Sequence, residues 1–218
     1  MTEHDVAVRY TFQGKDQDRK DRMPDSRFLE TPRLGVRKAT ADDAAFIHQL
    51  WTSPDVMKFV GFSQGIPISV EEVRKQIVDG PSAEFGSRLV VELLTTGERI
   101  GQTKLEIPDA QGICEPDIKL HPSVWSCGYG TELWRALIDY AFEHSAATIV
   151  QGTPNRDNIA SVRMQTGAGM VQVDEGVFDS HVGKVPGAIR VPYLKLQITR
   201  ESWKMLKDTG CGTSKETP

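Results

Sequence analysis

The stretch Trp125-Ser-Cys-Gly-Tyr-Gly-Thr-Glu132 decides the fold, because it places two glycines between a strand pattern and an amphipathic helix pattern. A short glycine loop lets consecutive backbone N–H groups point into one concavity, and the following helix adds the positive end of its dipole. The junction therefore predicts a site for an anionic group such as a phosphate. Glycines at this spacing also occur in ordinary tight turns, so the rest of the chain has to decide between the two interpretations.

The two common nucleotide fingerprints do not fit this loop. The chain has no Gly-x-x-x-x-Gly-Lys-Ser/Thr run, and Leu133 stands where a dinucleotide fingerprint carries its third glycine. The nature of the anionic ligand therefore has to be inferred from the elements around the loop.

The composition is that of one soluble domain with tails. The chain has 218 residues, of which 39% are hydrophobic and 26% charged, which suits one sizeable core. The net charge of −4 argues against nucleic acid as the main partner. No apolar run is long enough for a membrane span and the first residues lack a signal-peptide core, so we expect a cytoplasmic protein without membrane contact. Its three cysteines lack metal-ligand spacing, so we expect reduced thiols and no metal.

The part of the chain before residue 89 is expected to contain a strand and two helices. Residues 1–27 are polar and read as an N-terminal extension, and Arg33–Lys38 alternates as a strand does. Thr40 is expected to cap a first helix, and Ser69–Val78 forms a second one, because Ser69 and Glu72 have capping-box spacing. The first helix is expected to turn four residues inward: Ala45, Phe46, Leu50 and Trp51.

Three strands then form an antiparallel meander that leads to the glycine loop. They are expected at Leu89–Thr95, Arg99–Ile107 and Ile113–Leu120, with turns between them. Alternation along the third strand sends Glu115, Asp117 and Lys119 to one face of the sheet and Cys114, Ile118 and Leu120 to the other.

The pattern after the loop returns the chain to the same sheet. Helices are expected at Thr131–His144 and Asn158–Thr166, and strands at Thr148–Gly152, Val171–Phe178 and Ile189–Ile198. The strand, helix, strand order implies a right-handed crossover and a parallel pair beside the meander. The fold class is therefore α+β, with a mixed, mostly antiparallel sheet of about seven strands flanked by about four helices. Residues 201–218 read as a polar C-terminal tail.

Several motifs in register resemble the GNAT superfamily of acetyl-CoA-dependent N-acetyltransferases. They are the glycine loop with Thr131-Glu132, the run Asp157-Asn158-Ile159-Ala160-Ser161, and Gly169-Met170. The opening Leu29-Glu30-Thr31-Pro32-Arg33-Leu34 and the run Pro54-Asp55-Val56-Met57 are similar to its RimJ/RimL-like branch. The resemblance covers roughly residues 28–200, which we take as the acetyltransferase domain.

The resemblance implies where acetyl-CoA, the cosubstrate, binds. The loop and the first helical turn would hold the CoA pyrophosphate, and the strand before the loop would splay from its parallel neighbour, so that its free backbone groups bind the pantetheine arm. Asn158 resembles an asparagine that contacts the CoA arm, and it can also cap its helix. The full set of expected cosubstrate-binding residues is Lys119, Leu120, His121, Ser126, Cys127, Gly128, Tyr129, Gly130, Thr131, Asn158 and Ser161.

The chain departs from the pattern at the position of the general acid. Many members of the superfamily carry a tyrosine in the last helix that protonates the departing thiolate, and Gln165 stands at the matching position here. Ser161, one turn earlier, is the substitute we expect to hydrogen-bond the CoA sulfur, although it can equally serve close packing. The attacking amine has to lose a proton, and Glu115 and Asp117, or Glu106, are the candidate bases.

The expected reaction is direct attack of a primary amine on acetyl-CoA, with a strand N–H polarising the thioester carbonyl. Two alternatives remain open at this point. One is an acyl-CoA-binding module of the same fold with little or no turnover, which the missing tyrosine favours. The other is a cysteine hydrolase that uses Cys127 with His121 or His144.

The sequence leaves the acceptor open between small amines, antibiotics and protein N-termini. The segments expected to select it, Phe59–Ile68 and Asp179–Gly187, carry no readable motif. A homodimer is compatible with the sequence.

Overall fold

The computed structural model describes residues 27–179, 181–185 and 187–210. The expected N-terminal extension therefore lies almost wholly outside the described residues, as does the last part of the C-terminal tail. None of the helices within the described ranges is long and apolar enough to cross a membrane.

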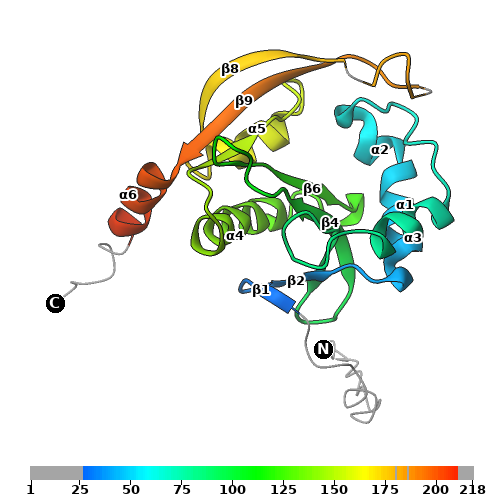
Figure 1. Ribbon diagram of the computed structural model, residues 1–218, viewed down its shortest axis with the longest axis horizontal. Helices are drawn as coiled ribbons and strands as arrows, with labels where there is room; N and C mark the ends of the chain where they lie inside the picture. The colour runs from blue at the N-terminus through cyan, green and yellow to red at the C-terminus, as the bar shows by residue number, and fades with distance from the viewer. Residues whose placement is uncertain (1–26, 180, 186, 211–218) are drawn as a thin grey trace, which may run out of the picture.

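The strands form two sheets (Figure 1). In the first sheet every neighbouring pair is antiparallel. Its strands, in spatial order, are β1 (Arg27–Glu30), β2 (Leu34–Lys38), β3 (Leu89–Leu93), β4 (Arg99–Leu105) and β6 (Pro116–Leu120). The second sheet has the order β5 (Ile113–Cys114), β7 (Ile149–Gly152), β9 (Val191–Thr199) and β8 (Val171–Phe178). β5 and β7 form the expected parallel pair.

The predicted strand Ile113–Leu120 is divided between the two sheets, which corrects the prediction of one continuous strand. β5 pairs with β7, whereas β6 pairs with β4. Pro116 stands at the first position of β6, where its missing N–H breaks no ladder. Because the chain changes sheets around Glu115, β6 becomes an edge strand of the first sheet and its outer side faces away from β4.

Six α-helices and three 3₁₀ turns accompany the sheets in the described residues. The helices are α1 (Ala44–Thr52), α2 (Pro54–Met57), α3 (Val70–Val78), α4 (Tyr129–His144), α5 (Ile159–Thr166) and α6 (Arg200–Gly210). The 3₁₀ turns are η1 (Ala41–Asp43), η2 (Lys58–Val60) and η3 (Pro122–Val124). Figure 1 shows α1, α2 and α3 on one side of the first sheet and α4 on the other.

The alternation of β3 explains this layering. Leu89 and Val91 are buried in the core that contains α4, and Val90 is buried in the core that contains α1 and α3. Successive side chains of a strand point to opposite faces, so an apolar run such as this one needs a helix layer on each side. The expected fold class is thereby confirmed, with short β1, β5 and α2 as additions.

Two expectations fail locally. Ala45 is exposed, because the buried face of α1 is formed by Ala44, Ile47, Leu50 and Trp51 at helical spacing and Ala45 lies off that face. Residues 200–210 form α6, where a polar tail without secondary structure was expected. Two of the three predicted caps are observed: the Ser69 hydroxyl accepts from Glu72 N–H at 3.2 Å, and the Asn158 side chain accepts from Ser161 N–H at 3.2 Å. Thr40 instead precedes η1, and its hydroxyl donates to the Asp43 carboxylate at 3.1 Å.

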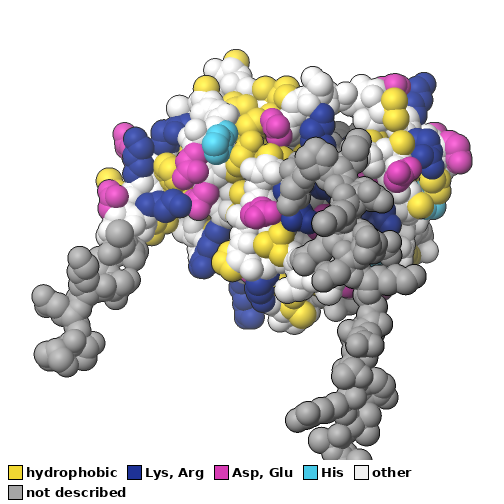
Figure 2. All heavy atoms as spheres, turned by 90° about the horizontal axis from the view of Figure 1, so that it is seen from below, with side chains coloured by type: hydrophobic (Ala, Val, Ile, Leu, Met, Phe, Trp, Pro, Cys, Tyr) yellow, Lys and Arg dark blue, Asp and Glu magenta, His cyan; other side chains and the backbone are white. Residues whose placement is uncertain are grey.

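The visible surface carries both signs of charge. In Figure 2, Lys and Arg side chains lie among Asp and Glu side chains over much of the face that is drawn.

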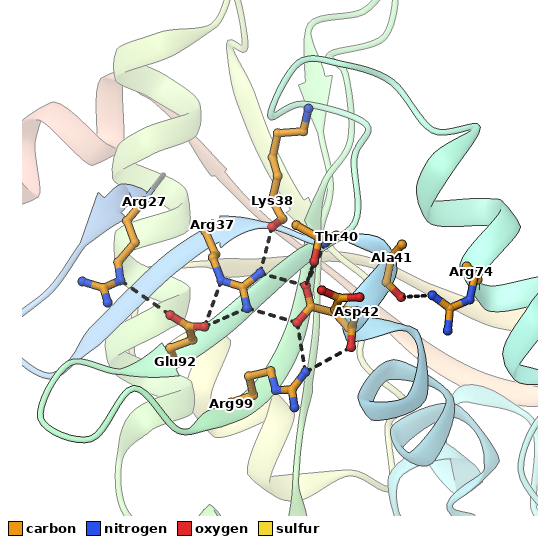
Figure 3. A network of polar contacts seen from close by, with 10 residues as sticks. Arg27, Arg37, Lys38, Thr40, Ala41, Asp42, Arg74, Glu92 and Arg99 are labelled. Atoms are coloured by element: carbon orange, nitrogen blue, oxygen red, sulfur yellow. Dashed lines mark hydrogen bonds and ion pairs between the residues drawn. The ribbon is translucent and has the colours of Figure 1, made fainter. Parts of the chain in front are cut away.

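A buried ion network ties β2 and β3 to the start of α1 (Figure 3). The Arg37 guanidinium donates to both Asp43 oxygens, at 2.8 and 3.0 Å, and also pairs with Glu92. Arg99 adds a contact of 3.2 Å to Asp43, whose side chain is almost fully buried. Burial alone would raise the pKa of Asp43, but the hydrogen bonds from Arg37 and from Thr40 N–H lower it to about 2.

Replacement of Asp43 by asparagine tests this network. The variant keeps the shape but leaves Arg37 and Arg99 without their shared anion, so we expect a loss of about 3 kcal/mol in the free energy of unfolding at pH 7, measured by urea denaturation. Because the pKa of Asp43 lies below its unfolded value, its contribution is complete above about pH 4 and falls away toward pH 2. The difference between wild type and variant should shrink over that range.

The matched control is Asp42→Asn, which removes an exposed carboxylate next to Asp43. We expect it to change stability by less than about 0.5 kcal/mol. Equal losses in the two variants would contradict a special role for Asp43.

Candidate functional site

The glycine loop reverses the chain between the end of β6 and the start of α4. Gly128 adopts a φ of 79°, and Ser126 adopts a φ of 63°, the one positive φ of a non-glycine residue in the described part of the chain. Such a conformation is costly for a residue with a side chain, and strain of this kind is often kept at functional sites. The first N–H groups of a helix have no partner within it, so those of Tyr129, Gly130 and Thr131 are available to a ligand.

A cavity of about 410 Å³ opens beside this loop. It is bounded by the loop, by β6, by α5 and by the α2–η2 segment. Its walls bring together Asp55, Val56, Lys58, Phe59, Ile118, Lys119, Leu120, Val124, Trp125, Ser126, Gly128, Tyr129, Gly130, Thr131, Asn158, Ala160, Ser161 and Met164. Most of the residues expected to bind the cosubstrate are among them. Cys127 and His121 are not, so the two lie outside the cavity that their neighbours form.

Gly130 allows α4 to approach α5 closely. A Cβ atom at this position would lie 3.1 Å from the Met164 sulfur and 3.8 Å from a Leu120 methyl group. A side chain here would also enter the space between the two helices that the cavity uses. Together with the free N–H groups, this cradle fits a phosphate-bearing arm such as that of CoA.

A cluster around Glu132 fixes the start of α4. Its carboxylate accepts from the Thr31 hydroxyl at 2.6 Å, from Arg33 N–H at 3.0 Å and from Arg33 Nε at 2.6 Å. Burial raises the pKa of Glu132, but the hydrogen bonds from Thr31 and Arg33 outweigh burial and hold it below its usual value. The carboxylate therefore stays ionised and ties the helix to the β1–β2 turn.

Arg33 extends this cluster into the loop itself. Its Nη1 donates to the Cys127 carbonyl at 3.0 Å, and its guanidinium lies 4.4 Å from the centre of the Tyr129 ring. From the sequence, Arg33 was expected only as part of the opening motif and had no role of its own. One signal could have indicated the role of Arg33: Arg33 and Glu132 each lie in one of the motifs that carry the family resemblance.

The backbone of β6 offers fewer free groups than expected. His121 N–H donates to the Ile100 carbonyl at 2.8 Å, and Trp125 Nε1 donates to the Leu120 carbonyl at 2.9 Å. Because neighbouring residues of a strand point their N–H groups to opposite sides, Leu120 N–H points away from β4. Of the three expected residues Lys119, Leu120 and His121, Leu120 is therefore the one whose N–H faces the open side.

The position of the expected tyrosine holds a buried amide. Gln165 is 4% exposed, and its Nε2 donates to the Ser161 hydroxyl oxygen at 3.3 Å. Its Oε1 is buried without a hydrogen-bond partner among the described residues and fills the space where a side chain at Gly152 would begin. As an acceptor from Gln165, Ser161 keeps its own hydroxyl proton for a donor role in the cavity.

The candidate bases are held by other side chains. Glu115 accepts from the Thr153 hydroxyl at 2.6 Å and from Gln151 Nε2 at 3.4 Å. Asp117 is bonded to the Lys119 ammonium, which is 8% exposed and lines the cavity. Glu106 is paired with Lys104. None of the three carboxylates lines the cavity directly, so proton transfer to any of them needs a relay or an approach along the sheet face.

The structure gives the cysteine hydrolase alternative no support. The Cys127 thiol donates to the Trp125 carbonyl at 3.6 Å, and the His121 ring is bonded to Ser123. His144 ends the helix that begins at Tyr129, about 22 Å away at 1.5 Å per residue. In the described ranges, no group of three or more His, Cys, Asp or Glu residues could hold a metal ion.

Residues 33–171 match the family described as the acetyltransferase (GNAT) domain. The chain belongs to this family. It is an N-acetyltransferase that takes its acetyl group from acetyl-CoA.

Individual relatives agree with this assignment. The chain is 26% identical over 138 residues to the uncharacterized N-acetyltransferase p20 of Bacillus licheniformis, covering 62% of this chain and 78% of the relative. It is 27% identical over 201 residues to the FsC-acetyl coenzyme A-N(2)-transacetylase of Aspergillus fumigatus, covering 87% and 83%. The crystal structure of spermidine N-acetyltransferase from Vibrio cholerae, in complex with CoA and spermine, is similar in fold, with a TM-score of 0.65 at 21% identity over 80% of this chain and 99% of that one.

Replacement of Gly128 by valine tests the loop as the binding site of acetyl-CoA. The side chain would be strained at a φ of 79° and would meet Arg33 Nη2, so the loop N–H groups would move. We expect the dissociation constant of CoA, measured by calorimetry, to rise about tenfold or more, since strain at such a position is about 1 to 2 kcal/mol.

Gly183→Val is the matched control. Gly183 has a φ of 75° but no heavy atom within 4 Å of an added Cβ, so its variant carries similar backbone strain away from the loop. Unchanged CoA affinity in Gly128→Val would separate the loop from the cosubstrate site.

Proposed function

We propose that this chain transfers the acetyl group of acetyl-CoA directly to a primary amine, with residues 126–131 holding the CoA pyrophosphate. The observation that supports this best is the single cavity beside the loop, which joins free helix N–H groups, the open edge of β6 and Ser161. A pyrophosphate at the loop leaves the β6 edge for the pantetheine arm, as an added strand would lie. Acetyl-CoA supplies the thioester.

The residues of the chain would divide the remaining work. Leu120 N–H faces the open edge and would donate to the thioester carbonyl as negative charge develops on it. The attacking amine forms the new C–N bond while the C–S bond breaks, and its proton would pass toward Asp117 or Glu115. Ser161 would donate a hydrogen bond to the departing sulfur, in the role that a tyrosine has in many members of the family.

Gln165 is the residue that would slow turnover, as the alternative of a CoA-binding module with little activity supposed. Its amide cannot protonate a thiolate, so the rate depends on Ser161 or on water. Detection of free thiol and of acetylated amine by mass spectrometry, with an amine panel, measures this rate: we expect catalytic release of CoA.

Cys127→Ala is a control for that experiment. Direct transfer needs no acyl-cysteine, so we expect kcat to stay within about twofold of wild type, because the substitution removes one exposed side chain that lies outside the cavity. An acetylated Cys127 that turns over at the rate of the reaction would exclude direct attack.

Finer assignments remain proposals. The RimJ/RimL-like branch is supported by the opening motif, whose Thr31 and Arg33 hold Glu132. A small-molecule amine is the acceptor class we favour, since the Vibrio structure holds spermine and the Aspergillus relative is named for an N(2) position.

A cytoplasmic location agrees with the free thiols of Cys114 and Cys127. A homodimer is supported only by the exposed edge strand β8.

Ser161→Ala tests the donor to the leaving group. A hydrogen bond to a charged group is worth about 1.5 to 3 kcal/mol, so we expect kcat to fall about 30-fold while the KM of acetyl-CoA changes less than twofold. Gln165→Leu should give a smaller fall, because Ser161 remains but loses the partner that orients it.

The control on the same helix is Thr166→Ala, whose hydroxyl donates to the Val162 carbonyl at 3.0 Å and is exposed. We expect kcat of this control to match that of wild type. If Ser161→Ala retains full kcat, the leaving group is stabilised by some other donor.

A further inference from the structure

A second cavity, of about 560 Å³, lies between α3, the segment before β3, and β4. It is separate in its lining from the cavity at the glycine loop. Its charged residues are Lys75, Arg88 and Lys104, with Glu72 and Asp79 on the α3 wall. None of the residues assigned to acetyl-CoA binding, to proton transfer or to the leaving sulfur lines this cavity, so the proposed reaction gives it no role.

Arg88 and Lys75 of this cavity have no carboxylate partner among the described residues, and of the two Lys75 is exposed whereas Arg88 is half-buried. Its guanidinium lies 4.6 Å from the centre of the Trp51 ring, and its one hydrogen bond to a side chain is a long one, 3.4 Å to the Gln76 amide oxygen. No carboxylate of the described residues lies within 4.0 Å of it. Burial lowers the pKa of Arg88, and the more distant charges of Asp117 and Glu106 offset this only in part.

The other partly buried cations nearby are already paired. Lys104 is bound to Glu106 and Lys119 to Asp117. On the neighbouring strand β2, Arg37 forms ion pairs with both Asp43 and Glu92. A desolvated guanidinium without a carboxylate is unfavourable unless an anion completes it, and its planar fork matches a carboxylate in two parallel hydrogen bonds.

The strand register connects Arg88 to the reaction site. Leu89 pairs with Thr103, which places Arg88 beside Lys104, and Lys104 pairs with Asp117. Adjacent strands lie about 4.8 Å apart, so the backbones at Arg88 and Asp117 are about 10 Å apart. Asp117 is bound to Lys119, which lines the cavity at the glycine loop. One polar face of the sheet therefore runs from Arg88 to that cavity.

We propose that Arg88 binds a carboxylate of the amine acceptor, so that this enzyme acetylates an amine that is also an acid. This deepens the proposed function and rests on it. The carboxylate would sit on Arg88 over Trp51, and the amine would lie toward Asp117, where its proton leaves and the thioester is within reach. Because the two strand positions are only about 10 Å apart along the sheet, the acceptor we expect is a small amino acid with a side-chain amine.

The remaining charges of the cavity agree with a zwitterionic acceptor. Glu72 and Asp79 are exposed on the α3 wall, and the Glu72 carboxylate is held by Ser69 N–H at 2.8 Å. A polyamine, which carries only positive charges, would place one of them near Arg88 and Lys75. The proposal therefore predicts selection for the carboxylate against the corresponding simple diamine.

The test compares acceptors that differ only in the carboxylate: ornithine with putrescine, and lysine with cadaverine and with lysinamide. For wild type we expect kcat/KM to be about 30-fold higher for the acid than for its partner, as one charge-assisted pair would give. In Arg88→Gln this ratio should fall to about one, and in Arg88→Lys to an intermediate value, while the KM of acetyl-CoA stays unchanged.

Arg74→Gln is the control. It removes the same charge from the exposed side of α3, where Arg74 binds the Ala41 carbonyl at 2.7 Å, and it should leave the ratio as in wild type. Equal or higher activity with putrescine and cadaverine than with the acids, or an unchanged ratio in Arg88→Gln with intact thermal unfolding, would overturn the proposal.

Calorimetric titration of ornithine and lysine into the CoA-bound protein separates this proposal from the proposed function. Binding of the acids that Arg88→Gln abolishes supports the carboxylate site even if no acceptor is turned over, a result that would count against the transferase instead. If neither acid binds nor is acetylated while other amines are, the transferase stands and the Arg88 site does not.

Discussion

The structure depends on the change of sheet at Glu115 and Pro116. A strand that stayed in one sheet would have both edges paired, and no ligand could lie against it. Because β5 joins β7 while β6 joins β4, the outer edge of β6 is open and the cavity forms beside it. Glu115 sits at the junction, and its bonds to Thr153 and Gln151 hold the two sheets together where their backbones part.

The glycine loop can serve as an anion site because interactions with residues outside the loop stabilise its strained backbone. Ser126 and Gly128 take left-handed backbone conformations, which a free loop would not keep. Glu132 and Arg33 hold the first turn of α4 against the β1–β2 turn, and Arg33 also bonds the Cys127 carbonyl. The N–H groups of the loop are thus positioned without any lysine or arginine in the loop itself.

Local interactions were predictable from the sequence, and interactions between distant segments were not. Ser69 and Asn158 cap their helices as expected, because each cap involves residues three apart. The exposure of Ala45 is also a local property, since Ile47, Leu50 and Trp51 define the inward face of α1 and Ala45 does not lie on it. The hydrogen-bond partners of Glu115 and Asp117 depend on strand register. Whether Arg88 has a carboxylate partner depends on which residues of α3 pack near it, and α3 supplies only the Gln76 amide.

Gln165 shows how a site can lose one residue and keep its arrangement. Glutamine is shorter than tyrosine, and its amide N–H can donate a hydrogen bond but is not acidic enough to protonate a thiolate. It lies against Gly152, where any larger residue would collide with its amide, so the amide has one way to point. Its N–H then goes to Ser161, which turns the serine hydroxyl toward the cavity. In the proposed reaction Ser161 would donate to the sulfur while the proton itself comes from solvent, because a thiolate whose conjugate acid has a pKa of about 8.5 can leave before it is protonated.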